Sequence, residues 1–245
     1  MKTNTQLKNE ALAALRGNWG KAVLATLVLF ILASLVSGPT IYTQSQLTEY
    51  MEENVGSHST LRSMSSLILD PAFQAIQQRS RATSSFATIF QILVLIPFTL
   101  GLANAFRRLL LRGETEILSI SVRIATDNYW HKVWGMLLSG IFVFLWSLLL
   151  VIPGIIKLFS YSMTKYILED YPELSASEAI DRSRAMMRGH KFDLFWLYLS
   201  FIGWALLCVL TAGIGYLWLV PYMETAEAAF YEDVKADYAL HGGLI

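Results

Sequence analysis

The chain has 245 residues, of which 54% are hydrophobic and 16% are charged, whereas soluble globular proteins carry about 25% charged residues. Its Lys and Arg residues equal its Asp and Glu residues in number, so net charge gives no argument for a nucleic acid or an acidic partner. The apolar residues lie in long uncharged runs, a pattern typical of a protein that crosses a membrane several times. The only cysteine, Cys208, excludes an internal disulfide and a cysteine-based metal site.

The chain begins with a short amphipathic segment, residues 5–16, which places Leu7 and Ala11 on one helical face. Gly17 is suited to end this helix. We expect the helix to lie on the membrane surface with its basic residues toward lipid headgroups. Basic residues before an apolar run are also typical of a signal peptide, but several further apolar runs follow, which indicates an uncleaved first span over residues 22–38.

Residues 43–85 form a long hydrophilic segment, rich in Ser, Thr and Gln, in which we expect short helical pieces at best. Asp70 followed by Pro71 is a good helix start, because Asp can cap a helix and Pro fits its first position. The helix that begins there is expected to run into the second span, residues 86–106, which Arg107 ends.

An apolar stretch without any charge covers residues 133–152. Its length of about 20 residues gives about 30 Å of helix, the thickness of the bilayer hydrocarbon. A Pro-Gly pair then breaks the helix and a shorter apolar arm, residues 154–168, follows. We therefore expect a transmembrane hairpin formed by the third and fourth spans. The fifth and sixth spans are expected at residues 194–212 and 214–230.

Together these patterns predict an all-α fold, which is a polytopic membrane bundle of about six transmembrane helices with short amphipathic surface helices. The bundle is expected to be one integral-membrane domain over residues 1–245. Six spans place both termini on the same side. Most Lys and Arg residues fall on that side, which predicts cytoplasmic termini in the bacterial inner membrane and an extracytoplasmic segment 43–85. The exceptions are Arg62, Arg79, Arg81 and Lys157.

A basic amphipathic helix that ends in Arg-Gly occurs twice, at Arg16-Gly17 and at Arg188-Gly189. The second of these helices begins with Ser175 and a Glu three residues later, the pattern of a capping box. The recurrence indicates a repeated unit of surface helix plus hairpin. Chance recurrence of a dipeptide is the alternative.

Several polar residues lie inside the expected spans, where an ionisable group costs several kcal/mol unless it faces protein or water. Lys165 and Glu224 each lie about 16 Å along their spans, so they could form an ion pair. The functional interpretation is an ion or substrate pathway, and the structural one is anchoring and helix-to-helix pairing. The residues of this candidate pathway are Lys157, Ser160, Tyr161, Thr164, Lys165 and Glu224.

Sequence motifs for catalysis are absent: the chain has no phosphate-binding glycine loop, no G-x-S-x-G and no H-E-x-x-H. The adjacent carboxylates Glu169-Asp170 and Glu232-Asp233 point apart on a helix and make poor acid–base pairs. We therefore expect no catalytic, cofactor-binding or metal site, and no enzyme. The basic stretch 182–191 lies between two expected spans, which favours a membrane surface over a nucleic acid.

Three stretches resemble one family of bacterial integral-membrane proteins, the domain of unknown function 975. They are LKNEALAALRGNWGKAVLATLV at residues 7–28, IPGIIKLFSYSMTKYILEDYPELSASEAIDRSRAMMRGHKFDLFWLYLSFIGW at residues 152–204, and GIGYLWLVPYMETAEAAFYEDV at residues 213–234. The resemblance implies a multi-span inner-membrane protein. It implies no activity and no functional residues.

The functional hypothesis from these observations is a non-enzymatic, envelope-associated membrane protein. Its partners would be the lipid bilayer and anionic lipid headgroups at the basic surface helices, and not nucleic acid. The alternative is a transporter or exporter of a small or lipid-like molecule, since bent helices and internal repeats recur in transporters. A membrane-embedded lipid enzyme is the third hypothesis, and it would need a reactive cluster that the sequence does not display.

Overall fold

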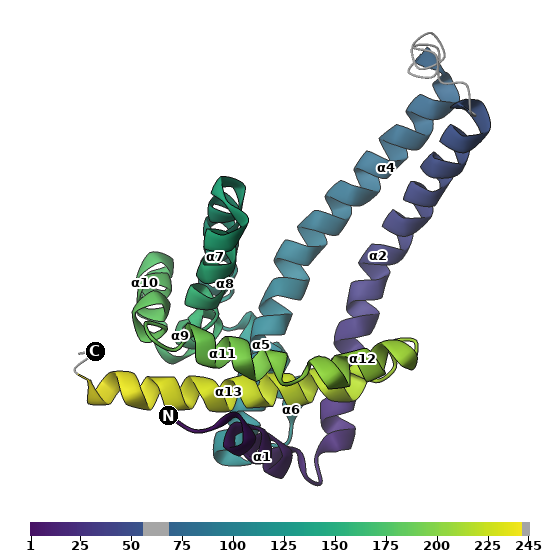
Figure 1. The fold of residues 1–245 in the computed structure, drawn as a ribbon. Helices are drawn as coiled ribbons and strands as arrows, with labels where there is room; N and C mark the ends of the chain where they lie inside the picture. Colours follow the sequence, from purple (N-terminus) through teal and green to yellow (C-terminus); the bar gives the residue numbers. More distant parts are fainter. Residues whose placement is uncertain (56–68, 242–245) are drawn as a thin grey trace. The chain divides into compact units, whose positions relative to one another are not determined.

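The computed structural model describes residues 1–55 and 69–241, and these residues form helices without any β-strand (Figure 1). The all-α prediction is therefore confirmed. The helices, in chain order, are α1 (Asn4–Leu15), α2 (Trp19–Val55), α4 (Pro71–Phe90), the π-helical turn η1 (Gln91–Leu95), α5 (Ile96–Arg112), α6 (Ile117–Thr126), α7 (Tyr129–Leu149), α8 (Val151–Tyr161), α9 (Thr164–Asp170), α10 (Ala176–Met186), α11 (Lys191–Leu199), α12 (Ile202–Leu210) and α13 (Tyr216–Leu240).

Four helical segments in the described part of the chain are long and apolar enough to cross a membrane, so the six predicted spans are not confirmed. The predicted span 154–168 divides into α8 and α9, and the 11 residues of α8 cover only about 16 Å. Most of the predicted span 214–230 lies in α13, which begins at Tyr216, and part of this helix is protein core: Glu227 is 4% exposed. The four segments are Trp19–Glu53, Pro71–Arg112, Tyr129–Leu149 and Lys191–Leu210.

The prediction of short helical pieces at best in residues 43–85 is wrong for residues 43–55, because α2 continues to Val55, whereas the predicted helix that begins at Pro71 is confirmed by α4. Hydroxyl side chains in this polar stretch bond to backbone carbonyls one turn earlier: Thr48, for example, donates to the carbonyl oxygen of Gln44 at 3.0 Å. These hydrogen bonds stay within one helix, so the hydroxyl groups find their partners without leaving it. The remainder of the predicted segment, which includes Arg62, lies outside the described residues.

The predicted helix ends are confirmed in three places. Asp70 caps α4 by accepting a hydrogen bond from the backbone N–H of Ala72 at 2.7 Å. Ser175 and Glu178 form the predicted capping box at the start of α10. Gly189, which follows α10, has a φ of 88°, a backbone conformation that glycine adopts without strain.

The smaller of two compact units, residues Phe30–Leu95, contains most of α2 together with α4. Two side-chain pairs connect these helices. The hydroxyl groups of Thr43 and Thr83 lie 3.2 Å apart, and Tyr50 donates its hydroxyl to Asp70 at 2.8 Å.

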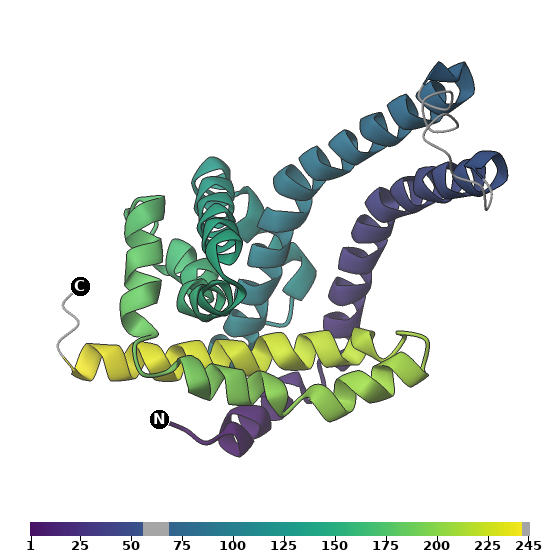
Figure 2. The same ribbon diagram turned by 45° about the horizontal axis from the view of Figure 1, so that its top comes forward.

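The larger unit comprises Met1–Leu29 and Ile96–Ile245 and contains the main core. Its α13 crosses the direction of the α7–α8 hairpin steeply, and α11 and α12 run along α13 (Figures 1 and 2). The rings of Tyr166 and Tyr231, which are both fully buried, stack with centroids 4.8 Å apart. These two rings hold α9 against α13 at the centre of the unit.

Close contact between α5 and α6 depends on Gly101. A Cβ atom at this position would lie 2.2 Å from the carbonyl oxygen of Ser121 and 3.3 Å from the backbone nitrogen of Ala125. Both atoms belong to the backbone of α6, so neither can move aside as a side chain would. The absence of a side chain therefore lets the two helices approach closely and bury Ile120 and Ile124.

We expect Gly101→Ala to lower the free energy of unfolding by about 1–3 kcal/mol, because the added methyl group forces α5 and α6 apart. The matched control is Gly140→Ala, in the interior of α7, where an added Cβ meets no atom within 4 Å and removal of glycine stabilises the helix by about 0.5–1 kcal/mol. Thermal unfolding in detergent measures both. Equal effects of the two variants would contradict the close helix contact.

Candidate functional site

The polar residues predicted for the fourth span are not brought together along one path. Helix α8 ends at Tyr161 and α9 begins at Thr164, so the helical spacing assumed for residues 157–165 is interrupted. The ammonium group of Lys157 lies over the ring of Trp146, 4.6 Å from its centroid. Ser160 donates its hydroxyl to the carbonyl of its own helix, and the buried hydroxyl of Thr164 has no partner among the described residues.

Lys165, in contrast, forms ion pairs with two glutamates, Glu224 and Glu227. The Lys165 Nζ lies 3.0 Å from Glu224 Oε2 and 3.0 Å from Glu227 Oε2. The two glutamates are one helical turn apart on α13, so both carboxylates can face α9. Tyr198 of α11 donates its hydroxyl to Glu227 at 2.7 Å. This group, Lys165, Glu224, Glu227 and Tyr198, is called the lysine cluster below.

The lysine cluster holds two carboxylates for one ammonium group. Glu227 is almost fully buried, whereas the side chain of Glu224 is 30% exposed. A second negative charge at a buried site is costly unless it is compensated. The cluster can therefore accept one proton and become neutral, which is the chemistry its residues permit.

A second group of charges surrounds Asp170, at the end of α9. Arg107 of α5 binds the carboxylate with two nitrogens, at 2.5 and 2.8 Å, and its Nε donates to Glu232. Lys235 and Tyr231 of α13 also donate to Asp170, at 2.5 and 2.8 Å. We call these five residues the arginine cluster; they join α5, α9 and α13.

Electrostatics in the arginine cluster favour the ionised carboxylate of Asp170. Burial acts to raise the pKa of Asp170, but the hydrogen bonds and positive charge of Arg107, with the hydrogen bonds from Lys235 and Tyr231, outweigh it and hold the pKa below its ordinary value.

A third group connects the start of α7 to the end of α9. Lys132, which is 1% exposed, donates to Glu169 at 2.6 Å and to the carbonyl oxygen of Ile124 at 2.8 Å. Arg108 binds the other oxygen of Glu169 at 2.8 Å. The two ends of the stretch from α7 to α9 are therefore held together.

Sequence reasoning missed both clusters around Glu169 and Asp170. It interpreted Arg107 as the end of a span, and it considered the adjacent carboxylates only as partners for each other. Because these two carboxylates point apart, each meets a different arginine: Arg108 for Glu169 and Arg107 for Asp170. The sequence contains two adjacent arginines, Arg107 and Arg108, and two adjacent carboxylates, Glu169 and Asp170. This correspondence is the signal from which the two ion-pair clusters could have been predicted.

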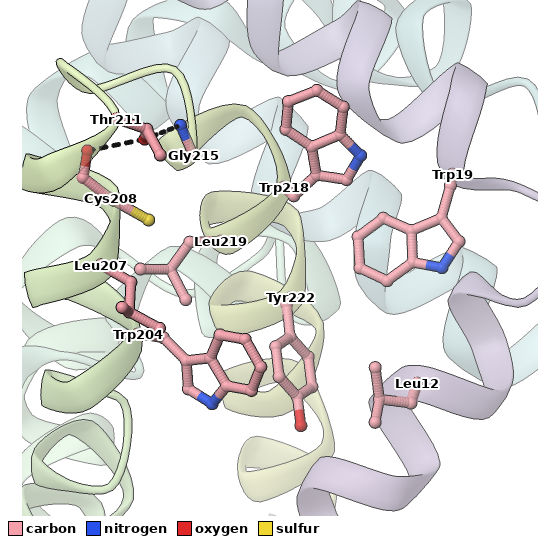
Figure 3. Close-up of a pocket in the computed structure, with 10 residues that line it drawn as sticks. All are labelled: Leu12, Trp19, Trp204, Leu207, Cys208, Thr211, Gly215, Trp218, Leu219 and Tyr222. Atoms are coloured by element: carbon pink, nitrogen blue, oxygen red, sulfur yellow. Dashed lines mark hydrogen bonds between the residues drawn. The ribbon is translucent and has the colours of Figure 1, made fainter.

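A separate apolar pocket of about 440 Å³ lies where α1, the start of α2, α12 and α13 meet. Its lining includes the rings of Trp19, Trp204, Trp218 and Tyr222 (Figure 3). No charged residue belongs to this lining. Among the described residues, no group of three or more His, Cys, Asp or Glu is placed to hold a metal ion.

The described residues 1–55 and 69–241 thus form an all-α structure with four helical segments long and apolar enough to cross a membrane. The chain belongs to the family described as "Protein of unknown function (DUF975)", whose family model matches residues 1–238. The resemblance found in the sequence is thereby confirmed. No curated protein and no solved structure matches the chain.

We expect Lys165→Met to lower the free energy of unfolding by about 3–5 kcal/mol, because it leaves two carboxylates without a counter-charge at a buried site. Lys157→Met is the control, since Lys157 lies over the rings of Trp146 and Tyr161 and forms no ion pair with a carboxylate of the described residues. The midpoint of thermal unfolding in detergent, measured for both variants, tests this. Similar midpoints for the two variants would show that the lysine cluster contributes little to stability.

The arginine cluster predicts a dependence of stability on pH. Because the pKa of Asp170 is lowered by folding, its contribution is present above the unfolded value of about 3.9 and is lost as pH falls through the folded value. We expect Asp170→Asn to be less stable than wild type at pH 7 and to lose less stability below about pH 4. Asp181→Asn, on the exposed face of α10, is the control. Parallel pH profiles for wild type and Asp170→Asn would refute the assignment.

Proposed function

We propose that this protein is a multi-pass protein of the bacterial cytoplasmic membrane that catalyses no reaction and organises or assists components of the cell envelope. The observation that carries the proposal is the internal pairing of the charges in α5, α9 and α13. Arg107, Lys165 and Asp170 each bind partners within the chain. Charges that are paired with one another in this way connect helices, which supports a structural role for them.

The proposed topology has both termini in the cytoplasm. The 2.6 Å ion pair between Lys132 and Glu169 supports this topology. It joins the start of α7 to the end of α9, so the apolar α7–α8 hairpin would enter the membrane and return on the same side of it. The basic residues of α10 follow the hairpin directly, so they stay on that same side, as the excess of positive charge in the cytoplasm requires. Basic surface helices there would contact anionic lipid headgroups.

A transporter of a small or lipid-like molecule is the second candidate function. The observation that favours it is the unequal charge of the lysine cluster, in which Glu224 and Glu227 share Lys165. Glu224 is the more exposed of the two. A site that gains and loses one proton is a recurring part of proton-coupled transport.

Reconstitution into proteoliposomes of native lipid extract distinguishes the two functions. We expect wild type, Glu224→Gln and Lys157→Met all to give no proton or lipid flux above that of empty liposomes. Wild-type flux that Glu224→Gln abolishes and Lys157→Met retains would replace the proposed function by transport. Membranes washed with alkaline carbonate should retain the protein, and its release into the wash would contradict the membrane location.

A further inference from the structure

The pocket between α1, α2, α12 and α13 is apolar but unfilled by the protein's own side chains. Trp204 is 57% exposed and Trp218 49% exposed, so two large rings at the pocket have no protein cover on much of their surface. Exposed apolar area of this kind is stabilised when a ligand covers it. The volume of about 440 Å³ lies within the range of small-ligand pockets.

The two ends of the pocket differ in polarity (Figure 3). At one end the hydroxyl of Thr211 donates to the carbonyl of Cys208 at 2.9 Å and accepts from the N–H of Gly215 at 3.0 Å, so these groups satisfy one another. At the other end lie the hydroxyl of Tyr222 and the indole nitrogen of Trp204, and neither donor has a hydrogen-bond partner in the described part of the chain. Among the described residues, the hydroxyl and backbone groups around Thr211 are therefore paired, whereas the end near Tyr222 presents two unpaired donors.

A cation lies at the polar end. The ammonium group of Lys8 stands over the ring of Phe201, 4.2 Å from its centroid, and donates to the carbonyl of Ser200 at 2.8 Å. The Phe201 ring in turn packs edge-on against Tyr222, with centroids 5.0 Å apart. These contacts connect the positive charge of Lys8, through the ring of Phe201, to Tyr222 of the pocket lining.

Arg16 is a second cation that is close to the pocket in sequence. It lies between Leu12 and Trp19, which both line the pocket, and it directly follows α1, on which Lys8 lies four residues before Leu12. Arg16 is exposed and forms no ion pair with any described residue. The pocket thus has two neutral donors at one end, and Lys8 and Arg16 lie four residues before and four residues after Leu12 of its lining.

We propose that this pocket binds one acyl chain of an anionic phospholipid, with the lipid phosphate held by Lys8 and Arg16. The inference rests on the proposed membrane location and adds a specific lipid site to it. Arg and Lys form strong charge-assisted hydrogen bonds with phosphate oxygens. Tryptophan and tyrosine are the residues enriched where lipid chains meet their headgroups.

Native mass spectrometry of protein purified from nanodiscs of equal phosphatidylglycerol and phosphatidylethanolamine tests the site. We expect wild type to retain one phosphatidylglycerol. Leu207→Trp places an indole in the pocket, and retention should fall about tenfold, since displacing two buried methylene groups costs about that much. Leu206→Trp is the matched control, because Leu206 is a neighbouring exposed residue on α12 that does not line the pocket.

The headgroup contacts have their own variants, which lie on the surface and leave the core intact. Lys8→Gln with Arg16→Gln should remove the preference for phosphatidylglycerol over phosphatidylethanolamine, whereas Arg188→Gln, an exposed cation elsewhere, should keep it. Equal lipid retention by the Leu207→Trp and Leu206→Trp variants, or an unchanged preference in the double variant, would overturn the lipid site. Either result leaves the membrane location standing, which only release by carbonate contradicts.

Discussion

The buried guanidinium of Arg107 is the constraint on which the arrangement of the larger unit depends. A charge in this environment needs opposite charges with good geometry, because its desolvation costs several kcal/mol. Asp170 meets it from α9 and Glu232 from α13. Three helices that are distant in the sequence must therefore come together around one side chain, and their apolar faces pack as a result.

The same principle explains why the charges near the apolar helices occur in groups. Lys132 holds the end of α9 to the start of α7 through Glu169, and the lysine cluster holds α9 and α11 to α13. Helix α9 has only seven residues, yet charged residues from it enter all three groups. It acts as the common connection between the hairpin and the long C-terminal helix.

Much of the local structure could be predicted from the sequence, because caps, turns and apolar runs depend on neighbouring residues. The helix starts at Asp70 and Ser175 are such features. The number of spans could not be predicted, since apolar composition does not distinguish a helix that faces lipid from one that faces protein. Thus α13 reads as a span, although Glu227 and its neighbours are core. Nor could residues 43–55 be recognised as helical, because their hydroxyl groups can bond either to water or to the helix itself.

The candidate site was predictable only in part, for a related reason. The pairing of Lys165 with Glu224 could be predicted, because counting residues from the glycine at the start of each span places both side chains at the same depth. The partners of Arg107 lie 63 and 125 residues further along the chain, and no periodicity relates positions so far apart. This separation also has a consequence for biogenesis. At a synthesis rate of about 5–20 residues per second, Arg107 waits roughly 3–13 s for Asp170 and roughly 6–25 s for Glu232. The arginine therefore needs water or lipid phosphate as its temporary partner until α9 has been made, and its pairing is complete only when α13 follows.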